Sequence, residues 1–299
     1  MARTFAILAL TVFGFAAGPQ AALAQEAIIG ILEEHPGGDG AKPTAYVRAV
    51  FHKEGGAWTA YDPACAKGSC FPRETNWTIG FDGKSVGQVR AATPPTWPMM
   101  SDVGRQNLAA GARAPFVGQR ADKFAGWAGG PVYRPLVGTS TGHVTDPEAW
   151  KAGAIPAAAD QALRERMRAK FPTAERCASP EENVPKTWSY GDKDLVVDGG
   201  YVSASGWRVA RVGLKPEDYR CDGPMETSGE SAFSILSVAI APDGKMIDLG
   251  FDMRLLDAGD YDADGKSELV FFYSHYNADG YKLFSNGFAE QAAFGFSFH

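Results

Sequence analysis

The sequence lacks any concentration of positive charge. It contains 29 Lys and Arg against 35 Asp and Glu, and its formal net charge is −6. Proteins that bind nucleic acid or an anionic membrane surface carry clustered Lys and Arg, because these side chains neutralise phosphate groups. We therefore expect no nucleic-acid partner and no electrostatic attachment to a membrane.

Long hydrophobic runs are also missing beyond the N-terminus. A helix that crosses a bilayer needs about 20 consecutive apolar residues. The longest apolar stretch after the N-terminus, 233–241, is interrupted by Ser234 and Ser237. We expect no membrane span.

The N-terminus has the three parts of a secretory signal peptide. Arg3 supplies the positive end, residues 5–17 are apolar, and Ala22-Leu23-Ala24 forms a small-residue cleavage site before Gln25. The residue directly after this site is not a cysteine, so we expect no lipid anchor of the bacterial lipoprotein type. The pattern predicts a signal peptide over 1–24 and export to a periplasm or to the medium.

Cysteine is scarce, with four residues in the chain. Exported proteins fold in oxidising compartments, where cysteines pair, and four cysteines allow three pairings. Proximity favours Cys65 with Cys70, which leaves Cys177 with Cys221. A zinc site is the alternative, but the cysteine spacings and the scattered histidines lack a zinc-ligand pattern. We predict two disulfides.

Most of the chain after residue 25 has the pattern of β-strands. β-branched and aromatic runs are separated by turn signals such as Asp82-Gly83 and Asp243-Gly244, which favour tight hairpins. The predicted strands are 27–34, 46–53, 58–61, 77–81, 86–89, 195–197, 201–203, 207–212, 233–241, 247–256, 269–276, 281–284 and 294–298. We expect a mainly β fold, either propeller-like or a sandwich of antiparallel hairpins. In a propeller the N-terminal strand would complete the last blade.

One segment has helical periodicity instead. Apolar residues recur at i, i+4 intervals between Pro156 and Pro172, which predicts an inserted amphipathic helix over about 157–171. The apolar positions are Ala159, Leu163, Met167 and Phe171. Basic residues beside this stripe are typical of a solvated face, and a docking site is the alternative.

Residues 91–156 are rich in Pro and Gly and predict an irregular insertion.

Inside this insertion, Gly138-Thr-Ser140-Thr-Gly142 followed by His143 matches the G-x-S-x-G nucleophile motif. That motif needs a helix directly after it, within a βαβ sheet. The residues after His143 do not have a helical pattern. A hydrolase with a cleft around Ser140 and His143 is therefore the alternative to a non-enzymatic protein.

The strongest chemical signal is the stretch 260–268, which has acidic residues at its first, third, fifth and ninth positions. These residues are Asp260, Asp262, Asp264 and Glu268. Gly265, at the sixth position, allows a positive φ, so the Lys266 carbonyl at the seventh can also face inward. A divalent cation would remove the repulsion between the carboxylates. We predict a Ca²⁺ site; an acidic, solvated turn without metal is the alternative.

The loop is not an EF-hand, because position twelve, Phe271, cannot bind a cation. A strand over 269–276, a turn over 277–280 and a partner strand over 281–284 follow instead. A calcium loop that leads into a hairpin resembles the FG-GAP (VCBS, integrin-type) repeat, here as a single copy over 258–299. The resemblance implies a loop between two strands of a propeller blade. It also implies a calcium ion held by the side chains of Asp260, Asp262, Asp264 and Glu268 and by the Lys266 carbonyl.

These features together predict one exported, calcium-stabilised β-rich domain over 25–299. No coherent set of catalytic residues accompanies the calcium loop. We expect a non-enzymatic protein that binds another protein or a glycan at the cell envelope, or has a structural role there.

Overall fold

The computed structural model describes residues 27–35, 44–65, 70–117, 124, 133–176, 186–215 and 232–299. Strands predominate in this part of the chain, together with one α-helix, so the mainly β prediction is confirmed. The predicted signal peptide over 1–24 and the predicted Cys177–Cys221 disulfide lie outside the described residues.

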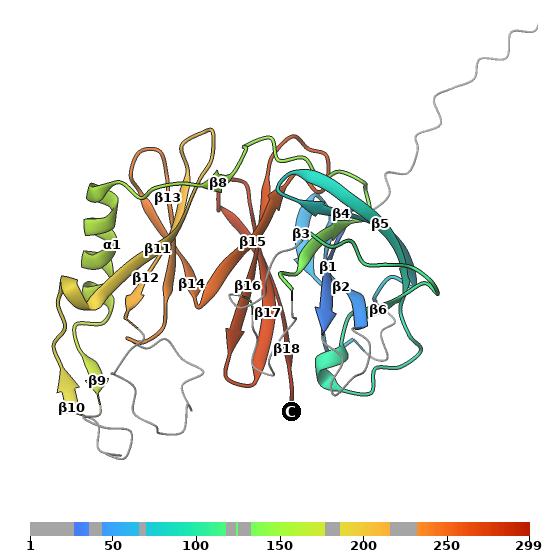
Figure 1. Ribbon diagram of the computed structural model, residues 1–299, viewed down its shortest axis with the longest axis horizontal. Coiled ribbons are helices and arrows are strands. Elements are labelled where there is room, and N and C mark those ends of the chain that lie inside the picture. Colours follow the sequence, from blue (N-terminus) through green and yellow to red (C-terminus); the bar gives the residue numbers. More distant parts are fainter. Residues whose placement is uncertain are drawn as a thin grey trace, which may run out of the picture.

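The N-terminal half of the chain forms a closed barrel (Figure 1). Its strands are β1 (Ile28–His35), β2 (Thr44–Glu54), β3 (Ala57–Ala60), β4 (Glu74–Phe81), β5 (Lys84–Ala92), β6 (Arg105–Leu108) and β7 (Leu136–Thr139). They pair in the order β1-β7-β4-β5-β6-β2, and β2 returns to β1, which closes six antiparallel strands; β3 extends from β2. The N-terminal strand therefore does not complete the C-terminal sheet as predicted, because β7 and β2 occupy both of its edges.

The Pro- and Gly-rich stretch 91–156 is not irregular throughout. It contributes the 3₁₀ turn η3 (Met100–Asp102) and the barrel strands β6 and β7. Strands of four residues are too short to show alternation in a sequence. All four residues of β7 are buried between β1 and β4, so tertiary packing decides their conformation.

The C-terminal half contains two open antiparallel sheets. The β11–β14 sheet has β11 (Leu195–Val202), β12 (Arg208–Leu214), β13 (Leu236–Ile240) and β14 (Met246–Phe251), with β8 (Lys151–Ala152) at one edge. The β15–β18 sheet is a meander of β15 (Met253–Gly259), β16 (Glu268–His275), β17 (Ala278–Ser285) and β18 (Glu290–Ser297). The remaining elements are α1 (Ala157–Lys170), η4 (Asp192–Asp194) and the two-stranded pair β9 (Ala174–Arg176) and β10 (Lys186–Trp188).

These elements form successive layers, which Figure 1 shows from left to right as α1, the β11–β14 sheet, the β15–β18 sheet and the barrel. Leu163 and Met167 of α1 are fully buried against the first sheet. Phe271 lies in the core between the two sheets. Tyr281 and Phe294 face the other way, into the core that the last sheet shares with the barrel.

The predicted strand 247–256 is in fact two strands in different sheets. Asp252 separates them and has a left-handed φ of 52°. The Asp252 amide donates to the Ile235 carbonyl at 2.8 Å, and the Asp252 carboxylate accepts from the Ile235 amide at 3.0 Å. This turn carries the chain from the β11–β14 sheet into the β15–β18 sheet.

The predicted helix is present as α1, and its apolar stripe faces the core. Its basic residues are engaged in ion pairs: Arg164 with Asp160, Arg166 and Lys170 with Asp248, and Arg168 with Asp192. The Arg166 and Lys170 pairs attach the helix to β14 and the Arg168 pair attaches it to η4, whereas the Arg164–Asp160 pair lies within the helix. Basic residues paired in this way do not favour a docking surface. No helix in the described part of the chain is long and apolar enough to cross a membrane.

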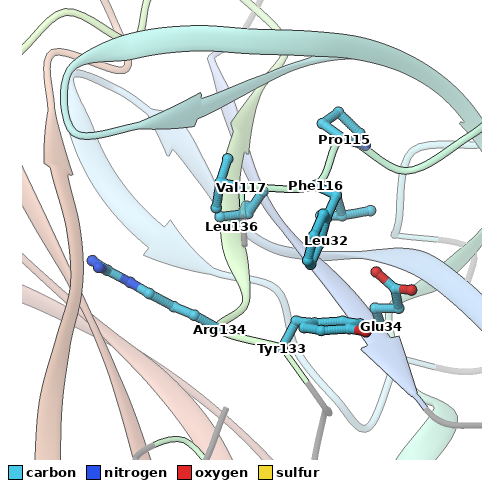
Figure 2. A pocket seen from close by; sticks show the side chains of 8 residues that line it. All are labelled: Leu32, Glu34, Pro115, Phe116, Val117, Tyr133, Arg134 and Leu136. Atoms are coloured by element: carbon cyan, nitrogen blue, oxygen red, sulfur yellow. The ribbon is translucent and has the colours of Figure 1, made fainter. Parts of the chain in front are cut away.

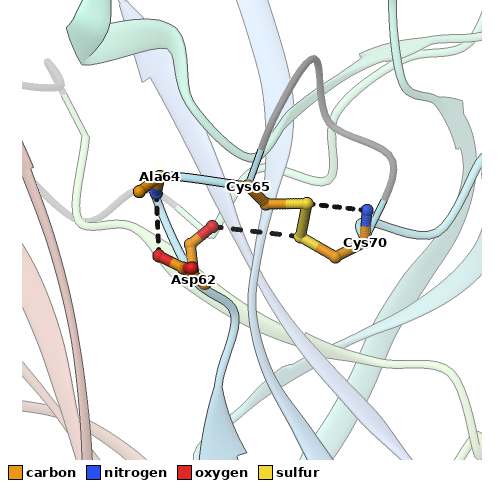
Figure 3. Close-up of a disulfide and its surroundings, with 4 residues drawn as sticks. All are labelled: Asp62, Ala64, Cys65 and Cys70. Carbon is orange, nitrogen blue, oxygen red and sulfur yellow. Dashed lines mark hydrogen bonds between the residues drawn. A yellow bond between two sulfur atoms is a disulfide. The ribbon is translucent and has the colours of Figure 1, made fainter.

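The Cys65–Cys70 disulfide is present as predicted (Figure 3). It closes a short loop between β3 and β4. The Asp62 carboxylate accepts a hydrogen bond from the Ala64 amide at 2.8 Å, so the entry to the loop is also held by a local turn.

Candidate metal centre

The acidic loop connects β15 to β16, at the edge of the sheet that packs on the barrel. Gly265 has a φ of 86°, as the predicted turn requires, and Ala263 also has a positive φ of 65°. A strand rather than a helix begins at Glu268. The predicted hairpin follows, although its turn contains only Tyr276 and Asn277, because the left-handed Asn277 reverses the chain at once.

Three of the predicted ligands come together. One carboxylate oxygen from each of Asp260, Asp262 and Glu268 lies within 4.8 Å of the others. All three are shielded from solvent: Asp260 is 8% exposed, Glu268 is 2% exposed and the Asp262 side chain is 3% exposed. Buried carboxylates at this spacing repel one another unless protons or a cation compensate their charge.

Main-chain amides of the loop orient these carboxylates. The Asp260 carboxylate accepts from the Asp264 and Gly265 N–H groups at 2.9 and 3.0 Å. The Glu268 carboxylate accepts from the Tyr261 N–H at 2.9 Å. The loop is therefore folded around its acidic side chains by local hydrogen bonds.

The Asp264 side chain, the fourth predicted carboxylate ligand, lies outside this group. The Asp264 side chain is 38% exposed, and its carboxylate accepts from the Lys266 N–H at 2.9 Å. Lys266 is exposed, and its ammonium donates to the Asn286 side chain at 3.0 Å. The structure thus gathers three of the four acidic side chains into one cluster.

The electrostatics of the cluster favour a cation. Burial raises the pKa of Glu268 to about 8, and the neighbouring Asp262 carboxylate adds to the rise. The Tyr261 amide and the Trp58 indole N–H act in the opposite direction. A divalent ion would lower this pKa, because it stabilises the charged form of each carboxylate that it contacts.

The barrel contributes two residues that the sequence did not indicate. The ammonium of Lys53, at the end of β2, forms an ion pair with Asp262. The indole of Trp58, in β3, is buried beside Glu268. Both residues are some two hundred positions from the loop, and no local pattern connects such distant segments.

The G-x-S-x-G segment supports the acidic loop. The hydroxyls of Thr139 and Thr141 both donate to the Tyr261 carbonyl, at 3.0 and 2.8 Å. Ser140 accepts from the Ile28 amide at 3.0 Å. His143 is exposed, and no helix begins in the chain after it before Ala157. The strand–motif–helix geometry of a hydrolase is absent from this described segment.

The segment that follows the motif is also attached to the loop. The Asp260 amide donates to the Thr145 carbonyl at 2.7 Å, and the Ser267 hydroxyl donates to the Asp146 carboxylate at 2.6 Å. Hydrogen bonds from residues 139–146 therefore hold the loop in place, in addition to the bonds within it.

A small hollow opens on the barrel surface beside β1 and β7 (Figure 2). It is lined by Leu32, Glu34, Pro115, Phe116, Val117, Tyr133, Arg134 and Leu136. Neither Ser140 nor His143 lines it, so it does not favour the hydrolase alternative.

Comparison of the chain with models of known protein families, with curated proteins and with solved structures found no match.

Proposed function

We propose that this protein is an exported, calcium-stabilised β-protein with a non-enzymatic binding or structural role at the cell envelope. The observation that carries the proposal is the cluster of three buried carboxylates from Asp260, Asp262 and Glu268. Oxygen donors of this kind suit a hard cation such as Ca²⁺. The ion would neutralise the cluster and stabilise the folded chain.

Asp260, Asp262 and Glu268 would hold the ion. The resemblance to an FG-GAP repeat adds Asp264 and the Lys266 carbonyl. The position of the loop between the first two strands of a four-stranded meander supports this resemblance. The face-to-face packing of the two C-terminal sheets supports a propeller-like or sandwich arrangement in that half of the molecule.

The disulfide supports the proposed compartment. Structural disulfides persist in oxidising environments such as a periplasm, and Cys65–Cys70 is formed. The proposed partner is another protein or a glycan of the envelope.

Calcium-dependent stability tests the metal site. Extracellular calcium modules bind with a Kd of roughly 10⁻⁴ to 10⁻³ M. Free calcium at about ten times Kd adds roughly 1.4 kcal/mol of stability. We expect calcium to raise the melting temperature of the wild-type protein by about 3 °C relative to chelator. Asp262→Ala removes a ligand and should abolish the rise.

Asp243→Ala is the control, because it removes the same carboxylate group from the exposed β13–β14 turn, where Asp243 accepts from the Lys245 amide and lies outside the cluster. It should retain the full calcium response. An equal response in Asp262→Ala would exclude these carboxylates as the ligands.

A further inference from the structure

The barrel places a cation of its own among the carboxylates of the acidic loop. Lys53 lies near the end of β2, and its ammonium pairs with Asp262 and lies 3.8 Å from Asp264. The side chain is only 23% exposed, and its ammonium lies 5.8 Å from the centre of the Trp58 ring. This cation therefore belongs to the packed junction between the barrel and the loop.

A second feature of this junction indicates an additional ligand. The indole N–H of Trp58 is buried and close enough to the Glu268 carboxylate to lower its pKa, but no acceptor within the described residues meets it with full hydrogen-bond geometry. A buried donor whose hydrogen bond is incomplete is costly, and such donors often mark a place for an ordered water. A water molecule carried by a bound cation would satisfy this N–H group.

We propose that Lys53 is a built-in counter-cation that holds the acidic loop closed when no divalent ion is bound, and that metal binding exchanges the ammonium for the ion. This inference rests on the proposed calcium site and identifies the group that regulates it. The Lys53 ammonium and the calcium ion would compete for the same carboxylate, that of Asp262. Each cation therefore weakens the binding of the other by the same factor. Lys53 then sets the calcium concentration at which the loop fills.

Replacement of Lys53 by an uncharged residue of similar length tests the exchange. We expect Lys53→Met to lower the calcium Kd roughly tenfold in isothermal titration with CaCl₂, since couplings between competing ligands are typically of this size. The same variant should melt at a lower temperature than the wild type in chelator, because the loop then has no cation. Lys53→Arg keeps the positive charge and should keep the wild-type Kd within about threefold.

Lys245→Met is the matched control, because Lys245 is an exposed lysine in the β13–β14 turn. It removes the same charge from the protein and should leave the calcium Kd unchanged. Lys53→Gln, which retains a polar end, replaces Lys53→Met if the latter does not fold.

The outcomes separate this inference from the proposed site. If Lys53→Met binds calcium and the wild type does not, Lys53 excludes the ion completely, which supports the exchange. Equal or weaker binding by Lys53→Met, with the wild type binding calcium, would overturn the exchange and leave the calcium site standing. No binding by either protein at about 10 mM calcium, ten times the weakest Kd of extracellular modules, would overturn both.

Discussion

Asp257 has a strongly perturbed carboxyl outside the acidic loop. It lies in β15 and is 7% exposed. Burial raises the pKa of Asp257 to about 7, although the nearby Arg134 guanidinium opposes the rise. The folded protein therefore keeps this carboxyl protonated at a pH at which the unfolded chain releases the proton.

The stability of the protein should consequently fall as the pH rises from about 4 to 7. In that window the folded state binds the proton that the unfolded state has lost, so deprotonation favours unfolding. Asp257→Asn removes the titrating group while retaining an acceptor oxygen. We expect its free energy of unfolding, relative to the wild type, to increase by about 2 kcal/mol between pH 5 and pH 8. Urea denaturation at both pH values measures this change.

Asp243→Asn, at an exposed turn, is the control and should follow the wild-type pH profile. If Asp257→Asn shows the same pH profile as the wild type, Asp257 is ionised in the folded protein.

At the scale of a single element, β17 depends on the absence of a side chain at Gly280. A Cβ at this position would lie 2.3 Å from the Phe294 carbonyl and 2.4 Å from the Tyr273 ring. The Tyr273 hydroxyl crosses over Gly280 to donate to the same Phe294 carbonyl at 3.3 Å. The glycine thus permits contact across β17 between its two neighbouring strands, β16 and β18.

We expect Gly280→Ala to lower the free energy of unfolding by about 1–3 kcal/mol, because the added methyl must displace either the tyrosine ring or the strand. Chemical denaturation measures the loss. Gly191→Ala is the control, since Gly191 also has a negative φ, and the nearest atom to a Cβ there would be an Asp194 carboxylate oxygen at 3.9 Å, an ordinary contact. A Gly280→Ala protein as stable as this control would show that the sheet rearranges without strain.

At the scale of the whole molecule, a buried ion pair within the barrel contacts the β15–β18 sheet. Arg48 of β2 is fully buried and donates to the Glu33 carboxylate of β1 at 2.6 Å. Tyr281 of β17 donates to the same carboxylate at 3.0 Å, and the Phe296 ring of β18 lies 3.9 Å from the guanidinium. Burial alone would raise the pKa of Glu33, but the charge of Arg48 holds it well below the usual range.

We expect Glu33→Gln to lower the free energy of unfolding by about 3–5 kcal/mol, because it leaves Arg48 charged and uncompensated in the core. Urea denaturation near neutral pH measures the loss. Glu34→Gln alters the adjacent, less buried residue of the same strand and should change stability by about 0.5 kcal/mol or less. Equal effects of the two substitutions would mean that the ion pair contributes no more than a surface charge.

Local patterns in the sequence determined much of the architecture. Alternating apolar runs and Asp-Gly turns predicted most strands of eight or more residues, and the i, i+4 stripe between two prolines predicted α1. The spacing of Asp260, Asp262 and Glu268 identified the acidic cluster, because side chains close together in a tight turn are also close in space. The proximity of Cys65 and Cys70 identified their disulfide for the same reason.

Only the tertiary structure decided how these elements combine. β1 closes a barrel instead of the last sheet, and the short strands β6 and β7 form because neighbouring strands satisfy their main chains. Lys53 reaches the acidic loop from a strand distant in sequence, and Thr139 and Thr141 donate hydrogen bonds to that loop. Contacts of this kind depend on long-range packing. The residues that touch come from segments far apart in the sequence, and no local sequence pattern shows that they will meet.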